Sequence, residues 1–542
     1  MKILLVAPYT AMSAVYNSYL TSLGVLSLAT VLKDDHCDVE IADFNSIFMN
    51  YPADRRSSYE DNLAAIVRYL VDKEADVVGF GTLCASLHDV LQVTEALKKA
   101  RPDTKIIIGG PQSLHLPDKL LAAFPWLDVI CVGEAETIIL PLMKGLAKGD
   151  LRDVPGIVYR SGGQIVRNLA PELIANLDDL PYIDYSLVPY VPNTRVTMEI
   201  GRGCPYQCVY CSTSLYWQRK FRTKSLFRIR KEIERIKDYV PAGDTITISF
   251  VDDNFTTNRR FAFDLCELLA GMGVNWDCSA RLDTLDEVII AKMAASGCKA
   301  IFIGVETGSP RMQKTINKNL NLDRFGPVTD AIIKYGIEPV TSYMYGFPGE
   351  TEDELKETLR LICAMLRKGA ARCGLHALCI IGGTKMYEDN KDDLVLRDQC
   401  SNIVDTLGMS ACQELMANNK ELFSHVYTLE GSLAERFLYL EKFMNLVVMS
   451  MFTVFPQSII AVLDIFNDDL LALYEDFIAR TEFASLLRQD GYVLLAMSKP
   501  AIFKATLKCY FGYIATKALG DFRFELIKHQ LWNAQEKLIP NA

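Results

Sequence analysis

Three cysteines, Cys204, Cys208 and Cys211, stand within eight residues at the spacing C-x3-C-x2-C. A strand-forming run at 194–200 leads into them, and glycine, arginine and proline then break the strand into a loop. Thiolates are soft ligands that select zinc, copper(I) or iron–sulfur clusters. Three close thiols without an evident fourth ligand predict a metal cluster with one open coordination position.

A structural zinc ion and inert buried thiols are the two alternatives to a cluster. Closed zinc sites take four Cys or His ligands, often as two separated pairs. No histidine occurs between His115 and His376, so a local Cys3His site lacks its fourth ligand. Three thiols in one short loop also differ from the isolated cysteines of apolar cores. The spacing therefore favours a [4Fe–4S] cluster.

The elements that position these thiols belong to a chain of 542 residues, which is long enough for two to four domains. Lys and Arg number 57 against 67 Asp and Glu, and the resulting net charge of -10 argues against a nucleic-acid surface. Fifteen cysteines follow a start without a secretory pattern, so we expect a reducing cytoplasm rather than a disulfide framework.

Residues 1–150 alternate short apolar runs with amphipathic helical patterns. Five buried strands are expected, at 2–7, 38–42, 76–81, 105–109 and 128–132. Helical patterns between them lie at 21–32, 62–73, 86–99 and 118–124. Such alternation predicts a Rossmann-like, doubly wound parallel sheet, which binds ligands outside the carboxyl ends of its strands.

Residues 194–390 repeat the strand–helix alternation around and after the cysteines. The expected strands lie at 194–200, 245–251, 275–283, 300–306, 340–345 and 375–381. This pattern predicts a (β/α)6 partial TIM barrel, in which functional residues sit at the carboxyl ends of strands. Polar and charged candidates at those ends are Asp252, Asp253, Arg281, Glu306 and Tyr345.

A connector at 151–193 contains two β runs around Ser161-Gly162-Gly163, which is a hairpin signal. Residues 391–542 show helical patterns, at 432–455, 470–488 and 501–519, and predict an α-helical domain that caps the barrel and shapes the substrate site. The stretch Phe443–Leu463 has no charge over 21 residues, but Pro456 interrupts it. We favour two buried helices over a membrane-associated segment there.

The cysteine loop resembles the signature of the radical SAM superfamily, with Tyr210 as the aromatic residue before the third cysteine. The stretches 304–309 (GVETGS) and 346–351 (GFPGET) also look like those of this superfamily. The resemblance implies a [4Fe–4S] cluster on Cys204, Cys208 and Cys211 whose fourth iron binds S-adenosylmethionine (SAM). It implies SAM contacts from the side chains of Tyr210, Asp252, Asp253, Arg281, Glu306 and Tyr345. One departure is Gly382-Gly383-Thr384, where the family often has a Pro-Gly-Thr turn.

Most of residues 1–150 resembles the cobalamin-binding domain of the B12-dependent radical SAM family, chiefly at 22–24, 109–111 and 132–136. The cobalamin contacts that this resemblance implies are Tyr9, Thr10, Leu83, Cys84, Gly109, Gly110, Gly133 and Glu134. An Asp-x-His-x-x-Gly motif is absent from the sequence, so the lower face of cobalt is expected without a histidine ligand. Leu83 and Cys84 would approach that face, with Cys84 as a less favoured cobalt ligand.

The resemblance implies a class B radical SAM C-methyltransferase that uses a 5′-deoxyadenosyl radical and methylcobalamin. Its substrate would be a natural product, peptide or metabolite, and a flavodoxin- or ferredoxin-type donor would supply electrons. Rearrangement or cyclisation with the same cofactors is one alternative. A methylthiotransferase is another, with Cys37, Cys84 and Cys131 as ligands of a second cluster. A non-catalytic cofactor sensor is the last, and the substrate stays unassigned.

Overall fold

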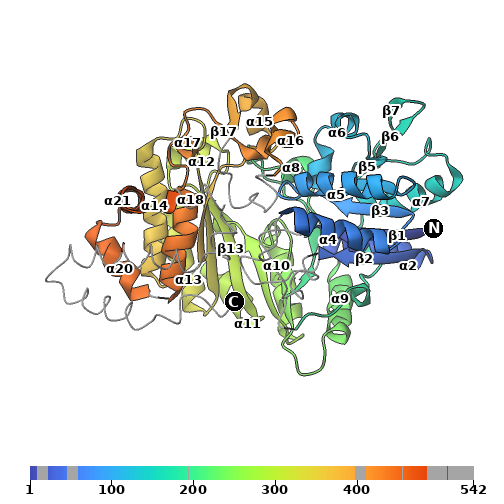
Figure 1. The fold of residues 1–542 in the computed structure, drawn as a ribbon. Helices are drawn as coiled ribbons and strands as arrows, with labels where there is room; N and C mark the ends of the chain where they lie inside the picture. The colour runs from blue at the N-terminus through green and yellow to red at the C-terminus, as the bar shows by residue number, and fades with distance from the viewer. Residues whose placement is uncertain are drawn as a thin grey trace.

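The computed structural model describes residues 1–8, 22–44, 59–192, 195–370, 372–396, 411–454, 456–484 and 510. Two α/β bodies lie beside each other, and helices of the last third cover the outer side of the second body (Figure 1). Tyr9, Thr10 and nearly all of the predicted helix at 501–519 lie outside the described residues.

The first body contains a seven-stranded sheet in the order β2-β1-β3-β4-β5-β6-β7. Its first five strands are parallel and confirm the predicted ones. They are β1 (Lys2–Ala7), β2 (Asp38–Asp43), β3 (Val77–Gly81), β4 (Lys105–Gly109) and β5 (Val129–Cys131). Strands β1, β3, β4 and β5 are short apolar runs, as expected for strands that are buried on both faces. The edge strand β2 is more exposed and has polar residues in its sequence.

Helices cover both faces of this sheet, because alternate strand residues point to opposite sides. On one side Ile3 and Leu5 join a core with α2 (Leu23–Asp34) and α7 (Ile139–Lys148). On the other side Leu4 and Val6 join a core with α4 (Tyr59–Asp72), α5 (Leu87–Ala100) and α6 (Pro117–Ala123). The doubly wound prediction is confirmed.

The predicted hairpin in the connector is also confirmed, and it extends the first sheet. Strands β6 (Ile157–Ser161) and β7 (Gln164–Arg167) pair antiparallel, and β6 pairs antiparallel with β5. Gly162 and Gly163 form the two-residue turn with φ of 56° and 81°, values that suit glycine in a tight hairpin.

The second body is a six-stranded parallel sheet in the order β15-β14-β13-β12-β11-β8. Its strands are β8 (Val196–Met198), β11 (Thr247–Phe250), β12 (Asn275–Ala280), β13 (Cys298–Glu306), β14 (Glu338–Tyr345) and β15 (Arg372–Ala377). Its helices are α9 (Leu226–Tyr239), α10 (Arg259–Ala270), α11 (Glu287–Ala295), α12 (Pro310–Thr315), α13 (Phe325–Lys334) and α14 (Glu352–Arg367). This is the predicted partial barrel. The sixth strand begins three residues before the expected range of 375–381, because Arg372 and Cys373 already pair with Val340 and Thr341.

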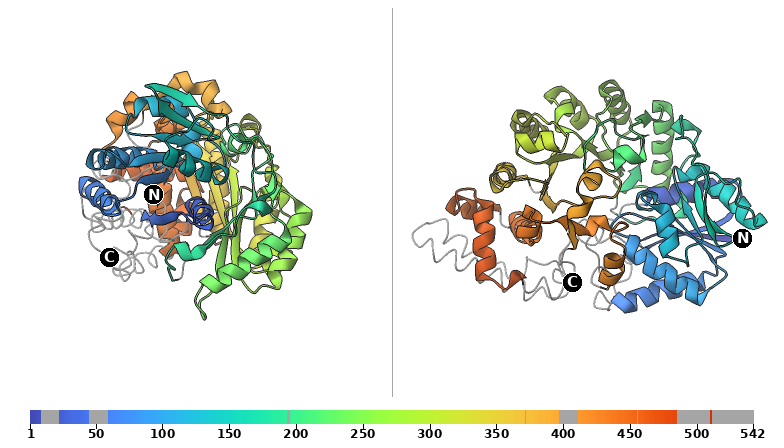
Figure 2. Two further views of the ribbon diagram at one scale, coloured as in Figure 1. Left: turned by 90° about the vertical axis from the view of Figure 1, so that its right-hand side faces the viewer. Right: turned by 90° about the horizontal axis from the view of Figure 1, so that it is seen from above.

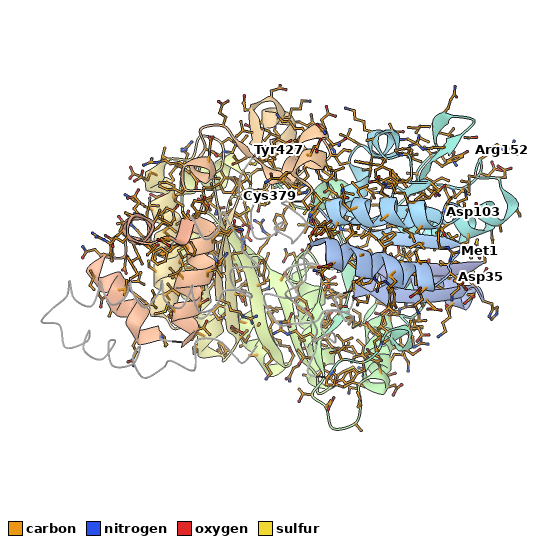
Figure 3. The ribbon with its side chains drawn as sticks, in the orientation of Figure 1. Met1, Asp35, Asp103, Arg152, Cys379 and Tyr427 are labelled. Carbon is orange, nitrogen blue, oxygen red and sulfur yellow. The ribbon has the colours of Figure 1, made fainter. Side chains whose placement is uncertain are left out.

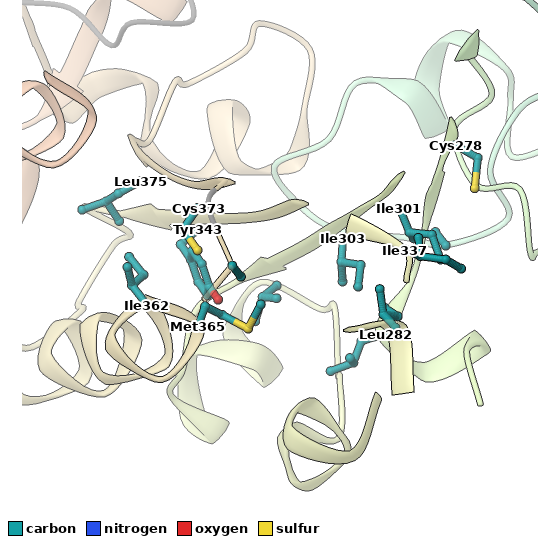
Figure 4. Packing of buried hydrophobic residues seen from close by; sticks show 14 of the residues in the cluster. Cys278, Leu282, Ile301, Ile303, Ile337, Tyr343, Ile362, Met365, Cys373 and Leu375 are labelled. Carbon is teal, nitrogen blue, oxygen red and sulfur yellow. The ribbon is translucent and has the colours of Figure 1, made fainter. Parts of the chain in front are cut away.

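One face of this sheet packs on its helices and the other is concave. Tyr343, Cys373 and Leu375 point toward Ile362 and Met365 of α14 in a buried cluster (Figure 4). Because side chains alternate along a strand, the neighbours of these residues in each strand face the concave side. On β13 the Phe302 side chain faces this side and keeps 44% of its surface exposed.

The last third is mostly helical, as predicted, but it also contains strands. Strands β16 (Leu394–Leu396) and β17 (Tyr427–Leu429) pair antiparallel, which the helical expectation missed because each has only three residues. The predicted helix at 432–455 is divided into α17 (Leu433–Arg436), α18 (Leu440–Lys442), the π-helical turn η9 (Phe443–Val448) and α19 (Met449–Val454). Further helices are α15 (Lys385–Asn390), α16 (Gln413–Asn418), α20 (Pro456–Ile465) and α21 (Leu470–Arg480).

The C-terminal helices close the open edge of the partial barrel. Segments α18 and η9 contact the edge strand β15, and α20 and α21 contact α14. Helix α20 begins at Pro456, which confirms the expected break in the uncharged stretch. Among the described residues, no helix is both long and apolar enough to span a bilayer.

The carboxyl ends of the first sheet face the second body. Met1, Asp35 and Asp103, which precede strands or lie near their amino ends, are at the outer end of the first body (Figure 3). Cys379, just after β15, and Tyr427 lie toward the junction between the two bodies (Figure 3). The views in Figure 2 show the same arrangement, with the first body beside the barrel rather than stacked on its helices.

Candidate functional site

The three cysteines lie in an irregular loop between a short hairpin and helix α8 (Thr213–Tyr216). The hairpin pairs β9 (Gly201–Arg202) antiparallel with β10 (Arg222–Thr223). Gly203 between β9 and Cys204 has φ of 97°, and a β-carbon there would stand 1.9 Å from the Lys220 carbonyl oxygen. Only glycine fits this turn, so the loop is forced to leave the hairpin immediately before Cys204.

Asp252 and Asp253 hold this loop from the end of β11. The Asp252 carboxylate accepts hydrogen bonds from the backbone nitrogens of Gly201, at 2.5 Å, and Ile200, at 3.1 Å. Asp253 accepts one from the backbone nitrogen of Gly203, at 3.1 Å. Burial raises the pKa of both carboxyls. The structure therefore brings both candidates to the cysteine loop, where they bind its backbone.

Tyr210 and Glu306 meet beside the cysteines. The Tyr210 hydroxyl lies 3.2 Å from Glu306 Oε1, and Lys318 Nζ donates to the same oxygen at 2.6 Å. Glu306 has φ of 69°, a left-handed conformation that is rare for a residue of this type. Burial raises the pKa of Tyr210 well above its usual value. The sequence did not predict Lys318 as a site residue, because its loop carries no motif that indicates a pair with Glu306.

Arg281 forms the other side of this polar group. Its guanidinium pairs with Asp283 at 2.9 Å, donates to the Lys318 carbonyl at 2.9 Å and stacks on the Tyr206 ring at 3.7 Å. Nη1 lies 3.9 Å from Cys208 Sγ. Two buried cations, Arg281 and Lys318, thus stand beside the cysteine loop, each paired with a carboxylate.

Tyr345 lies apart from the other candidates. Its side chain is fully buried on the helix-facing side of β14, and its hydroxyl donates to the Phe437 carbonyl at 3.0 Å. This geometry makes Tyr345 a contact between barrel and C-terminal helices. The sequence could not indicate the side of the sheet, because residues 340–345 show no alternation of polar and apolar side chains.

The three thiols offer soft ligands on one short loop. In a [4Fe–4S] cluster each such thiolate binds a different iron. Among the described residues, no group of three His, Cys, Asp or Glu side chains is placed to hold a single metal ion. Burial raises the pKa of the Cys204 and Cys211 thiols, and metal coordination would deprotonate them. The donor set therefore suits three irons of a [4Fe–4S] cluster.

The loops at the carboxyl edge of the first sheet interlock around Gly109 and Gly110. The backbone nitrogen and the hydroxyl of Thr82 both donate to the Gly109 carbonyl at 2.7 Å. A β-carbon on Gly110, with φ of 102°, would stand 2.6 Å from the Thr82 carbonyl oxygen. These glycines thus let two loops approach closely, and they hold Leu83 and Cys84 at the edge of the sheet.

Leu83 and Cys84 differ in what they offer a ligand. Leu83 leaves 50% of its surface exposed and presents an apolar side chain at this edge, which suits the flat face of a corrin ring. Burial raises the pKa of the Cys84 thiol and so disfavours the thiolate that would bind cobalt. The first-sheet edge therefore fits an apolar cofactor face without a thiolate ligand.

Gly133 and Glu134 are held against the second body. Glu134 pairs with Arg202 and Arg222, at 2.7 and 2.8 Å, and accepts from the Ile174 backbone nitrogen at 2.7 Å. The Gly133 carbonyl accepts from the Tyr216 hydroxyl at 3.4 Å. Both oxygens of Glu134 are thus engaged by protein groups.

A histidine that the sequence did not single out faces the concave side of the barrel. His376 Nδ1 lies 3.0 Å from Glu441 Oε1, and the other oxygen of Glu441 accepts from the Ala377 nitrogen at 3.2 Å. A β-carbon on Gly374 would stand 2.8 Å from His376 Nε2, so this glycine makes room for the ring. His376 keeps 13% of its side chain exposed. The sequence did not indicate His376 as a site residue, because its carboxylate partner, Glu441, is 65 residues away.

A cavity of 370 Å³ opens at the outer rim of the junction between the bodies. Its lining includes His115, Lys119, Tyr387, Lys391 and Glu421. No predicted site residue lines it, so it lies apart from the cysteine loop.

Comparison with known families agrees with this geometry. Residues 198–362 match the family model of the radical SAM superfamily, and residues 9–143 match that of the B12 binding domain. The first match spans the cysteine loop and most of the barrel, and the second spans strands β2 to β5 of the first sheet.

Relatives that match this chain include proteins named as methyltransferases and a cyclase. An uncharacterized methyltransferase of Pyrococcus horikoshii is 29% identical over 66% of this chain and 77% of its own. The anaerobic magnesium-protoporphyrin IX monomethyl ester cyclase of Rubrivivax gelatinosus is 25% identical over 53% of this chain and 54% of its own. The hopanoid C-2 methylase of Rhodopseudomonas palustris is 27% identical over 48% of each chain. The chain thus spans about half the length of the last two.

Two solved structures share the fold. The radical SAM methyltransferase TsrM from Kitasatospora setae, with cobalamin and a [4Fe–4S] cluster bound, gives a TM-score of 0.59 at 16% identity, over 72% of this chain and 78% of its own. The cobalamin-dependent radical enzyme OxsB, with aqua-cobalamin and SAM bound, gives 0.61 at 16% identity over 100% and 82%.

The structure thus places a three-cysteine partial barrel beside a doubly wound domain. The chain carries the two domains of a cobalamin-dependent radical SAM enzyme, a radical SAM domain and a B12 binding domain. The descriptions of the two matched family models name SAM and B12 as the cofactors of these domains. Enzymes of this class act on small molecules and need a reductant.

Proposed function

We propose that the protein methylates an unactivated carbon of a small-molecule, natural-product or peptide substrate. The observation that carries this proposal is the position of the cysteine loop. Its thiols stand beside Tyr210 and the buried Glu306, Lys318 and Arg281, at the carboxyl ends of barrel strands. The B12-type sheet turns its own carboxyl edge toward the same region.

When bound, the cluster with SAM supplies a 5′-deoxyadenosyl radical that removes a hydrogen atom, and cobalamin supplies the methyl group. Cys204, Cys208 and Cys211 would hold the cluster. Asp252 and Asp253 fix the backbone of their loop through the hydrogen bonds to residues 200–203. A fixed loop holds the reacting groups in a defined geometry, and such positioning is a main contribution of the protein to this chemistry.

The remaining site residues set charge and solvent access. Arg281 and Lys318 place positive charge beside the thiolates and suit the carboxylate of SAM. Glu306 and Tyr210 offer oxygen atoms for its polar groups. The C-terminal helices close the edge of the barrel at β15 and so limit water near a reactive radical.

We further propose that a flavodoxin- or ferredoxin-type protein donates the electrons and that the protein works in the cytoplasm. All thirteen cysteines in the described part of the chain are free, which supports a reducing environment. The net charge of -10 supports a substrate other than nucleic acid, and membrane association is not favoured.

Anaerobic reconstitution followed by a product assay tests the function. The wild-type protein should bind about four irons and one cobalamin, and Cys204→Ala, Cys208→Ala and Cys211→Ala should each lose most of the iron. Cys266→Ala, a buried thiol in α10, is the matched control and should keep it. With labelled SAM, reductant and substrate, both 5′-deoxyadenosine and S-adenosylhomocysteine should form. Deoxyadenosine alone would indicate rearrangement or cyclisation and contradict methylation.

A further inference from the structure

The turn after β5, Gly133-Glu134-Ala135-Glu136, carries two carboxylates to which the proposed function gives no role. Both contact arginine in the second body. Arg202 donates to Glu134 Oε1 at 2.7 Å through Nη1 and to Glu136 Oε1 at 2.7 Å through Nη2. Arg222 donates to Glu134 Oε2 at 2.8 Å. Two acids of the B12 domain therefore meet two arginines of the hairpin that leads into the cysteine loop.

These ion pairs are withdrawn from solvent. The side chains of Glu134 and Glu136 keep 1% and 10% of their surface exposed, and those of Arg202 and Arg222 keep 7% and 9%. The Trp217 ring covers both guanidinium groups: its centroid lies 5.7 Å from Arg202 Cζ and 5.3 Å from Arg222 Cζ. Buried charges of this kind are costly unless they are paired, and removing one partner leaves an uncompensated charge.

The charges balance across a wider group. Lys224 reaches Glu199 at 3.7 Å and Glu232 at 2.8 Å, and Arg228 reaches Glu232 at 2.6 Å. Four cations thus face four carboxylates, namely Arg202, Arg222, Lys224 and Arg228 against Glu134, Glu136, Glu199 and Glu232. Burial alone would raise the pKa of Glu136, but the charge of Arg202 lowers it below its usual value, so the carboxylate stays ionised.

The position of Arg202 connects this group to the chemistry. It lies two residues before Cys204, and the intervening Gly203 is fixed by its close approach to Lys220. On the barrel side, Asp252 and Asp253 hold the same backbone at residues 200–203. On the B12-domain side, the only ion-paired contacts to this hairpin in the described residues come from Glu134 and Glu136.

We propose that Glu134 and Glu136 are positioning residues that dock the cobalamin domain onto Arg202 and Arg222, and so fix the distance between cobalamin and the cluster. The connector at 151–193 adds to the same group, because Ile174 donates its nitrogen to Glu134 and accepts from Arg222 at its carbonyl. Elsewhere the two bodies meet through a shared apolar core and the contact of His115 with Gly382, so Glu134 and Glu136 supply the buried charged contacts to the hairpin before the cysteines. The proposal rests on the two cofactors of the proposed function but not on methyl transfer.

Electron spin measurements on the loaded enzyme test this role. In the dithionite-reduced holoenzyme, the reduced cluster and one-electron-reduced cobalamin are both paramagnetic, and their dipolar coupling reports the distance between them. The wild type should show one defined coupling. Glu134→Gln/Glu136→Gln should show a broadened or lost coupling, with iron and cobalt contents unchanged. Glu267→Gln removes a carboxylate that pairs with Lys292 on the surface and should match the wild type.

Two results would overturn the proposal. One is an unchanged coupling in the double variant when both cofactors are retained. The other is selective loss of cobalamin with normal iron content and normal thermal unfolding, which would make Glu134 a direct cobalamin contact. Where the double variant does not fold, Glu136→Gln alone leaves Arg202 paired with Glu134 and Glu199. It should shift the coupling in the same direction, and an unchanged coupling there would count equally against the proposal.

Discussion

The imidazole ring of His115 lies so close to Gly382 that a β-carbon on residue 382 would stand 2.2 Å from its Cδ2 atom. His115 follows η1 (Pro111–Leu114) in the first body, and Gly382 follows β15 in the second. The contact gives a steric reason for the departure from the Pro-Gly-Thr turn at this point. A proline ring in place of Gly382 would occupy the position of the imidazole.

Gly382→Ala should therefore destabilise the junction of the two bodies. We expect a loss of roughly 1–3 kcal/mol in unfolding free energy, as for other overpacked sites. Chemical denaturation followed by circular dichroism measures it. Gly24→Ala, at a helical position with nothing within 4 Å of the added carbon, should be neutral or slightly stabilising. His115→Ala should restore most of the loss in the double variant, and no restoration would locate the strain elsewhere.

Lys318→Met should unpair the Glu306 carboxylate, which is 10% exposed and 2.6 Å from the lysine. Breaking a buried pair by removal of one partner typically costs about 3–5 kcal/mol. We expect a loss of this size in anaerobic denaturation, together with weaker SAM binding. Lys292→Met breaks the exposed pair with Glu267 and should cost less than about 1 kcal/mol. Equal losses in the two variants would contradict a special role for Lys318.

Glu350 should make stability depend on pH. Burial raises the pKa of its carboxyl to about 7, although the Gly346 and Phe347 backbone nitrogens donate to Oε2. The folded state thus holds a proton that the unfolded chain releases near its ordinary value of 4.5. The stabilisation is complete below about pH 4.5 and is lost as pH rises through about 7, by about 3 kcal/mol at most.

Glu350→Gln should flatten this decline, because an amide oxygen still accepts the two backbone bonds but does not titrate. Unfolding free energies measured from pH 4.5 to 8 give the slope for each protein. Glu435→Gln changes a carboxylate that accepts from the Gly431 nitrogen in an exposed turn and should leave the slope unchanged. An identical slope in Glu350→Gln and wild type would assign the pH dependence to other groups.

His376→Ala should impair substrate use more than radical initiation. The ring faces the concave side of the barrel and is oriented by Glu441, so it is placed to hydrogen-bond a polar group of the substrate. Loss of such a bond should lower kcat/KM by about tenfold or more. Cleavage of SAM without substrate should stay near the wild-type rate. His36→Ala, in a surface turn, is the control. An equal fall in both rates would place His376 in SAM binding or folding instead.

Much of the architecture could be predicted from local patterns. Apolar runs separated by helical periodicity indicated the parallel strands of both sheets, and the Ser-Gly-Gly turn indicated the β6–β7 hairpin. These features depend on residues that are neighbours in the chain, so hydrophobic periodicity and turn chemistry record them directly. The cysteine spacing is likewise local, and by itself it predicts a soft metal site.

Only the tertiary structure decided which distant groups meet. Glu134 pairs with arginines 68 and 88 residues away, and Glu306 with a lysine in a loop that has no motif. Tyr345 faces the C-terminal helices rather than the site, and the sequence of β14 has no polar alternation that would have marked the concave side. Such contacts depend on how two sheets and a helical cap pack together, and no periodicity along the chain encodes that packing.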